Sequence, residues 1–298
     1  MKNIIYLSII LLLGIACQQK PKADSETIEN TEAEEVFESP TLSKLWESDT
    51  VLTTAEAVIY HPELDILFVS CINGTPPDSL DNDGFISQIS PVNGEIINLK
   101  WVEGISAPKG MGILGNSLFV SNINEVVEID ITSAEIINRY PVEGAAFLND
   151  ITIAEDSTVL ISDSGTNKII AIKEGEASTY LENADLKGPN GLLFRDGSIY
   201  TASFGGGDFM EIDYLTKELT VLTDSIMSGD GVMPVGEDFL VSSWPGEVYY
   251  VTSDGSKTLL SDTKADNISA ADIWYLEDKN MLLVPTFFAN SVVAYQLK

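Results

Sequence analysis

The feature that most constrains the fold is a repeat of about forty residues that begins near residue 50 and continues to the C-terminus. Each unit opens with a short apolar segment, and the six segments read "AEAVIY", "PKGMGI", "LNDITI", "PNGLLF", "GDGVMP" and "AADIWY". The equivalent positions within them are Glu56, Lys109, Asn149, Asn190, Asp230 and Asp272, with successive spacings of 53, 40, 41, 40 and 42 residues. The one long interval contains an insertion, "NGTPPDSLDNDG", from Asn73 to Gly84.

Within each unit, short runs of β-branched and aromatic residues follow one another with few convincing helices, as in "DILFVSCI", "NSLFVSNI" and "DFLVSSWP". Residues 41–298 divide into six units of 43 residues, which predicts an all-β, six-bladed β-propeller with four-stranded blades. The last unit ends one strand short, so we expect Leu42 to Ser48 to close the ring as the outer strand of that blade. An open β-sandwich array explains neither the period nor this strand.

The N-terminus resembles a bacterial lipoprotein signal. A basic start precedes a 12-residue apolar stretch, Ile4 to Ile15, which is too short to span a bilayer, and small residues lead to Cys17. We therefore predict a signal peptide over residues 1–16 and a lipid on Cys17, followed by an acidic disordered tether over residues 17–40. The expected location is the bacterial cell envelope, at the outer membrane because no Asp follows the cysteine. In the alternative, the signal peptide is an ordinary one and Cys17 is incidental.

Composition excludes several classes of function. The formal net charge is −30, which repels nucleic acid and anionic lipid headgroups and attracts divalent cations. With Cys17 lipidated, only Cys71 remains and no intramolecular disulfide can form. The single histidine, His61, lies in the turn-like "YHPELD", so a Ser-His-Asp triad is not expected. We expect a monomer that binds a small-molecule substrate.

The repeat brings oxygen-bearing side chains together. The first strand of every blade lines the central channel, so Glu56, Asn149, Asn190 and Asp230 should meet at one end of it. Carboxylate and amide oxygens suit Ca²⁺, Mg²⁺ or Mn²⁺, and the lack of Cys and His ligands argues against a tight structural zinc site. Taken singly, "NG" and "DG" are also ordinary turn dipeptides, and Asn149 could hydrogen-bond its own backbone. Four such residues in repeat phase favour a metal site.

The same residues carry a resemblance to the gluconolactonase family, which includes regucalcin and luciferin-regenerating enzyme, over residues 50–298. The resemblance implies one catalytic divalent cation in the channel, Ca²⁺ or another such as Mg²⁺, Mn²⁺ or Zn²⁺, and it implies that Asp230 is both a ligand and the general base. The implied ligands are Glu56, Asn149, Asn190 and Asp230. The chain departs from the family in two places. Glu56-Ala57-Val58 replaces a usual Glu-Gly-Pro, and Phe147 replaces an Arg that contacts sugar lactones.

The sequence therefore predicts a metal-dependent hydrolase of a lactone or other ester. Its substrate-pocket candidates are Lys109, Phe147, Phe204, Trp244, Asp272 and Phe287. Rim salt bridges would equally explain Lys109 and Asp272, and packing between blades would explain the aromatic residues. We interpret the insertion after residue 72 as a candidate lid. The alternative function is a non-catalytic, Ca²⁺-stabilised propeller that serves as a ligand-binding or scaffold lipoprotein.

Overall fold

The computed structural model describes residues 39–298, which form one compact unit. The predicted signal peptide (1–16), the lipid attachment residue Cys17 and all but the last two residues of the tether (17–40) lie outside the described residues. The predicted propeller occupies the described part of the chain.

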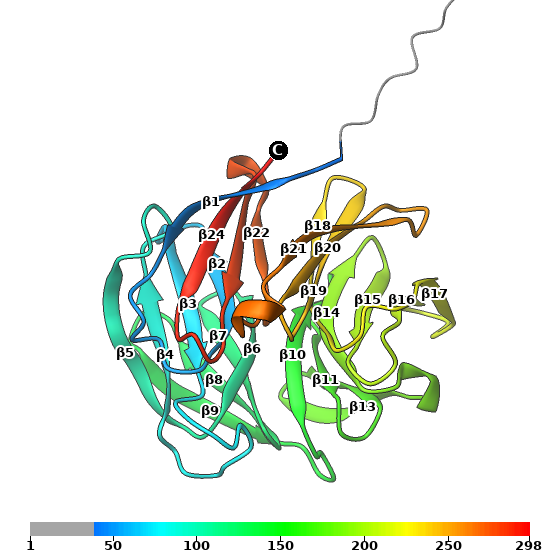
Figure 1. The fold of residues 1–298 in the computed structure, drawn as a ribbon. Helices are drawn as coiled ribbons and strands as arrows, with labels where there is room; N and C mark the ends of the chain where they lie inside the picture. Colours follow the sequence, from blue (N-terminus) through cyan, green and yellow to red (C-terminus); the bar gives the residue numbers. More distant parts are fainter. Residues whose placement is uncertain (1–38) are drawn as a thin grey trace, which may run out of the picture. The chain divides into compact units, whose positions relative to one another are not determined.

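Six four-stranded antiparallel sheets are arranged in a ring, as Figure 1 shows. Blade 1 contains β2 (Ala55–His61), β3 (Ile66–Cys71), β4 (Gly84–Ile89) and β5 (Ile96–Ile105). Blade 2 contains β6 (Pro108–Leu114), β7 (Ser117–Asn122), β8 (Glu125–Asp130) and β9 (Glu135–Pro141). Blade 3 contains β10 (Leu148–Ile153), β11 (Val159–Asp163), β12 (Lys168–Lys173) and β13 (Glu176–Glu182).

Blade 4 contains β14 (Pro189–Arg195), β15 (Ser198–Ser203), β16 (Phe209–Asp213) and β17 (Leu219–Thr223). Blade 5 contains β18 (Gly229–Val235), β19 (Asp238–Ser243), β20 (Glu247–Val251) and β21 (Lys257–Asp262). Blade 6 contains β22 (Trp274–Leu276), β23 (Met281–Pro285), β24 (Val292–Leu297) and β1 (Leu42–Glu47). The first strands of the blades contact one another in sequence around the ring, and β22 returns to β2. The predicted six-bladed propeller is confirmed.

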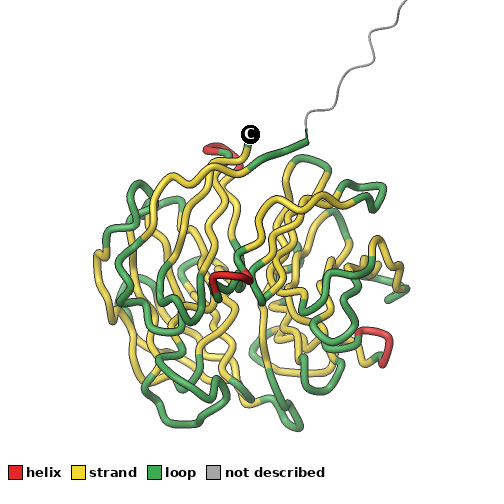
Figure 2. Tube along the Cα trace, in the orientation of Figure 1, coloured by secondary structure: helices red, strands yellow, loops and turns green. Residues whose placement is uncertain are grey.

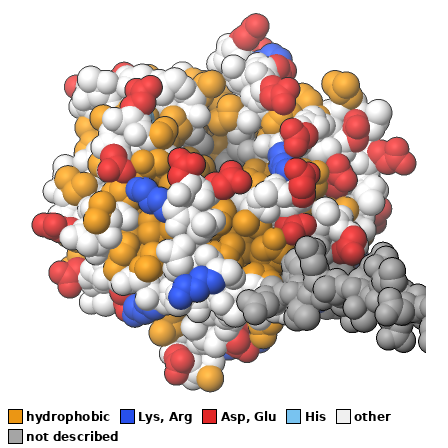
Figure 3. Space-filling view, turned by 90° about the horizontal axis from the view of Figure 1, so that it is seen from above, with side chains coloured by type: hydrophobic (Ala, Val, Ile, Leu, Met, Phe, Trp, Pro, Cys, Tyr) orange, Lys and Arg blue, Asp and Glu red, His pale blue; other side chains and the backbone are white. Residues whose placement is uncertain are grey.

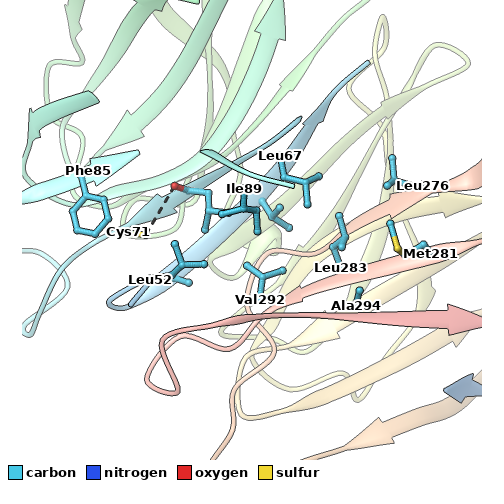
Figure 4. Close-up of a cluster of buried hydrophobic side chains, with 13 residues drawn as sticks. Leu52, Leu67, Cys71, Phe85, Ile89, Leu276, Met281, Leu283, Val292 and Ala294 are labelled. Atoms are coloured by element: carbon cyan, nitrogen blue, oxygen red, sulfur yellow. Dashed lines mark hydrogen bonds between the residues drawn. The ribbon is translucent and has the colours of Figure 1, made fainter. Parts of the chain in front are cut away.

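The ring is closed by the N-terminal strand. β1 pairs antiparallel with β24, from Leu42 opposite Leu297 to Glu47 opposite Val293, and Figure 1 shows the two strands side by side. Trp46 packs against a buried cluster shared by blades 1 and 6, part of which Figure 4 shows. This cluster includes Leu52, Leu67, Phe85, Leu283 and Val292. The predicted outer strand is therefore confirmed, and its apolar contacts join the first blade to the last.

Helix is almost absent from the described residues, as Figure 2 shows. The only helices there are three single 3₁₀ turns, η1 (Ala184–Leu186), η2 (Lys264–Asp266) and η3 (Glu277–Lys279). None of the helices in residues 39–298 is long and apolar enough to cross a membrane.

The core lies between the blades. Successive side chains of each strand point to opposite faces of its sheet, so every blade presents hydrophobic side chains to its neighbours. Seven clusters of buried hydrophobic side chains fill these spaces. Cys71 is fully buried in one of them as a free thiol, as expected for a small hydrophobic residue. Figure 3 shows acidic side chains around an area of hydrophobic side chains on one face.

Candidate functional site

The five predicted residues at equivalent repeat positions in blades 1 to 5 each lie at a β-bulge; they are Glu56, Lys109, Asn149, Asn190 and Asp230. The pairing of the first strand with the second shifts register across this residue in all five blades. The shifts fall between Ala55 and Ala57, Pro108 and Met111, Leu148 and Ile151, Pro189 and Leu192, and Gly229 and Val232. A bulge leaves one residue out of the ladder and re-aims its side chain. The bulges therefore explain how buried strands present polar side chains at one end of the channel.

Serine hydroxyl groups on the second strands accept hydrogen bonds from backbone N–H groups that the bulges leave unpaired. In blades 1, 3 and 5 the residue after the bulged position donates its N–H to such a hydroxyl at 2.8–2.9 Å. The acceptors are Ser70 for Ala57, Ser162 for Asp150, and Ser242 for Gly231. Buried backbone groups need such partners. The recurring serine in "FVSC", "LISD" and "LVSS" is thus a signal that the analysis of the sequence missed.

The "NG" and "DG" dipeptides lie inside strands β14 and β18, so the turn interpretation does not apply to them. A Cβ on Gly191 would overlap the backbone carbonyl oxygen of Asp230 in the next blade. A Cβ on Gly231 would likewise overlap Asp272 and Ile273. The glycines are required because the channel strands approach each other this closely.

The bulged residues line a cavity of about 480 Å³. All four predicted ligands line it, together with Lys109, Phe147, Phe204, Trp244 and Phe287. Ile72, Pro77, Ser164 and Gly165 complete the lining. Asp272 is not part of this lining, and its backbone N–H donates to the Glu56 carbonyl oxygen at 2.9 Å. Pro77 belongs to the insertion, so the insertion contributes one wall of the cavity.

Three of the four predicted ligands have a buried oxygen with no hydrogen-bond partner among the described residues. These atoms are Glu56 Oε2, Asn190 Oδ1 and Asp230 Oδ1. All three side chains are at most 5% exposed. Unpartnered buried oxygens are rare and need an explanation such as a bound ion, and oxygens of this type are ligands for hard divalent cations. The residues therefore fit the implied cation.

No group of three or more His, Cys, Asp or Glu side chains in residues 39–298 is arranged to hold a metal ion. The candidate set does not depend on such a group, because two of its four members are asparagine. Amide oxygens are ordinary ligands for calcium.

Burial shifts the pKa values of the carboxyl groups around the channel. It raises the pKa of Glu56 to about 8, against a smaller opposing effect of Lys109. It also raises the pKa of Asp230 well above the usual range, and repulsion from Glu56 adds to this effect. A hydrogen bond from Asn190 opposes it. Carboxyl groups in such a setting ionise readily only when a cation is present.

Asp150, which follows the predicted ligand Asn149, is buried but does not line the cavity. Its two carboxylate oxygens accept the backbone N–H groups of Ile151 and Leu192, both at 2.6 Å, and so connect blade 3 to blade 4. Burial raises its pKa to about 6 despite these bonds, and a further hydrogen bond links it to Asp272. Its only signal in the sequence is its place directly after Asn149 in "LNDITI".

Lys109 is the cationic residue of the cavity lining and is only 1% exposed. Its Nζ donates to the carbonyl oxygens of Pro77 at 3.1 Å and Ala107 at 3.2 Å, and it lies 4.6 Å from the Phe147 ring centroid. Within residues 39–298 neither Lys109 nor Asp272 forms an ion pair, so the rim salt bridges considered for them are wrong. Burial lowers the pKa of Lys109 to about 8.

Aromatic side chains from the loops after the second strands form the other wall. Phe204, Trp244 and Phe287 follow β15, β19 and β23 and line the cavity. Trp244 and Phe287 are also in edge-to-face contact, with ring centroids 5.3 Å apart. Phe288 packs on both and is half exposed. Trp244 and Phe287 therefore pack between blades 5 and 6 and line the cavity at once.

No protein-family model and no curated protein matches this sequence. The fold is similar to a gluconolactonase from Xanthomonas campestris, with a TM-score of 0.66 and 13% identity over 86% of this chain and 89% of the other. It is also similar to virginiamycin B lyase from Staphylococcus aureus, with a TM-score of 0.62 and 15% identity over 87% and 100%. A third similar structure is a streptogramin B lyase, with a TM-score of 0.62 and 13% identity over 87% of this chain and 98% of the other. At these identities the likeness shows a gluconolactonase-like propeller fold and no more.

Proposed function

We propose that this protein is a divalent-metal-dependent hydrolase of lactones or other esters. The observation that carries the proposal is the group of three unpartnered buried oxygens on residues that line one cavity. Glu56, Asn149, Asn190 and Asp230 would hold the cation. When bound, it would draw electron density from the substrate carbonyl. The gluconolactonase-like fold supports this reading.

Asp230 is the candidate general base because the resemblance to the gluconolactonase family implies that role for it and because its carboxyl group lines the cavity. It would take a proton from a water molecule as the water oxygen bonds to the carbonyl carbon. The carbon–oxygen ester bond then breaks, and the proton passes to the departing alkoxide, which leaves a carboxylic acid and an alcohol. Asn190, which has no proton to transfer, would only bind and orient.

Elimination chemistry that uses histidine is less well supported. The inactive form of the similar virginiamycin B lyase carries a His-to-Ala change. The one histidine here, His61, is at the end of β2 opposite Glu56, where its Nδ1 accepts the Leu64 N–H at 3.3 Å. It does not line the cavity.

Two substitutions test the proposal and separate it from a non-catalytic scaffold, which the same unpartnered oxygens would also suit. Asn190→Ala should weaken metal binding, and excess Ca²⁺ should restore part of any turnover. Asp230→Asn keeps an oxygen and the side-chain size, so at saturating metal it should still bind while hydrolysis falls roughly 100-fold or more. Calorimetry would measure binding, and a panel of lactones and aryl esters would measure turnover. Normal turnover by metal-saturated Asp230→Asn would exclude Asp230 as the base. Metal binding by a wild type that hydrolyses no ester would establish the scaffold.

We also propose that Cys17 carries a lipid that holds the propeller at the bacterial envelope. The support is the sequence of residues 1–17 alone.

A further inference from the structure

The cavity is divided into two chemically different halves. Blades 4, 5 and 6 contribute the aromatic side chains Phe204, Trp244 and Phe287. The opposite side, from blades 2 and 3, contributes Lys109 and the ring of Phe147 beneath its ammonium group. The four predicted ligands line the same cavity. A substrate whose carbonyl group lies at the ligands would therefore meet an apolar wall on one side and a positive charge on the other.

The charged ammonium group of Lys109 has only neutral groups as its direct contacts. Its ammonium group contacts two backbone carbonyl oxygens and one aromatic face, and no carboxylate lies within 4.0 Å of it in the described part of the chain. A buried charge without a counter-ion is costly, and a buried lysine usually has one. Glu56 and Asp78 act on it from farther away. However, Glu56 is a proposed metal ligand, and Asp78 is exposed on the insertion.

We infer that the preferred substrates are amphiphilic anions, meaning esters or lactones with a carboxylate on one side of the reacting carbonyl and an apolar group on the other. Lys109 receives the carboxylate, and Phe204, Trp244 and Phe287 receive the apolar group. This inference rests on the proposed hydrolase function for the reaction, but its binding part stands without it. It also gives Lys109 a positioning role toward the substrate, with Phe147 holding the ammonium head in place.

A matched pair of esters tests the charge preference. The 4-carboxyphenyl and 4-carbamoylphenyl esters of phenylacetic acid differ in charge but little in size. Wild type should have a kcat/KM at least roughly ten-fold higher for the anionic ester. Lys109→Met keeps the length of the side chain and should abolish that preference mainly through KM, whereas Lys109→Arg should retain it. Lys257→Met removes an exposed lysine of the outer strand β21 and should change nothing.

A binding experiment separates this inference from the proposed function. Calorimetry on metal-loaded protein would compare 3-phenylpropionate with its amide, which needs no turnover. Tighter binding of the acid by wild type and Lys109→Arg, but not by Lys109→Met, would support the inference even if no ester were hydrolysed. An acid preference that persists in Lys109→Met would mean that the metal receives the carboxylate and would overturn it. Equal losses of kcat by Lys109→Met on both esters would also overturn it, because Lys109 would then act on the reaction itself.

A substitution in the aromatic half tests the apolar part of the inference separately. Phe204 is 41% exposed, so Phe204→Ser should leave the fold intact. It should reduce the preference for phenylacetyl over acetyl esters several-fold and leave the charge preference unchanged. If the preference for the phenylacetyl group did not change, the inference that the substrate carries an apolar group would be wrong.

Discussion

The buried carboxyl groups make the stability of the protein depend on pH and on metal together. Glu56 has a pKa of about 8 in the folded, metal-free protein, raised by burial from 4.5. The folded state thus holds a proton that the unfolded chain releases between these two values. Its contribution to stability is full below pH 4.5 and is lost as the pH rises toward 8. Asp230 and Asp272 act in the same direction because burial raises their pKa values too.

The size of this effect follows from the shift. One pKa unit corresponds to about 1.4 kcal/mol, so raising the pH from 5 to 8 should cost the metal-free protein on the order of a few kcal/mol of its free energy of unfolding. For a domain of this size the melting temperature should fall by roughly 5–10 °C. A bound divalent cation keeps the carboxylates ionised at all these pH values, so it removes this loss. The stabilisation by Ca²⁺ should therefore grow as the pH rises.

Thermal unfolding from pH 5 to 8.5, with chelator or with excess Ca²⁺, measures this directly. Calorimetry at pH 6 should also detect proton release when the cation binds, because Glu56, whose pKa is about 8 without metal, must ionise. Glu56→Gln is the control, since it removes one titrating group and should flatten the pH dependence of the metal-free protein. Melting curves that stay a constant distance apart across the range would refute the reasoning, since metal and protons would then not compete for the same groups.

Other regions of the chain give three further predictions. Gly191→Ala should cost about 2–4 kcal/mol and weaken metal binding, because its methyl group would press on the Asp230 backbone; unchanged unfolding would mean that the strands can separate there freely. A chain starting at Asp49 loses β1 and Trp46 and should melt well below one starting at Ser39; equal melting temperatures would show that β1 does not stabilise the ring. Cys17→Ser should move the protein from the membrane to the soluble fraction of a bacterial host, and an unmodified Cys17 in a soluble wild type would exclude the anchor.

The ring could be predicted from the sequence because each blade repeats the same local pattern. The spacing of Asn149, Asn190 and Asp230 gave the number of blades and placed the three side chains at one end of the channel. The missing last strand pointed to Leu42–Ser48 for the same reason, since a sheet edge must be paired. These inferences needed only the length of the repeat and the alternation of apolar and polar residues, and both can be read from the sequence.

The depth of each residue in the channel could not be predicted in this way. Asn190-Gly191 reads as a turn because the sequence does not show that another strand passes against the glycine. Asp150 could not be selected from the sequence because its partner, the Leu192 N–H, is 42 residues away on the next blade. The β-bulges could not be predicted for the same reason. Each bulge depends on how a strand packs against its neighbour and not on the residues of the strand itself.

The same limit applies to the substrate. Phe147 stands where the sugar-lactone enzymes that the chain resembles carry an arginine, and from the sequence alone the polar clamp for a sugar lactone is missing. In the folded protein a cation nevertheless lies 4.6 Å from that ring, supplied by Lys109 on the adjacent blade. The sequence could not show this contact, because it joins two blades and depends on how they pack. The amphiphilic, anionic substrate inferred above rests on this cation and on the aromatic side chains of blades 4, 5 and 6.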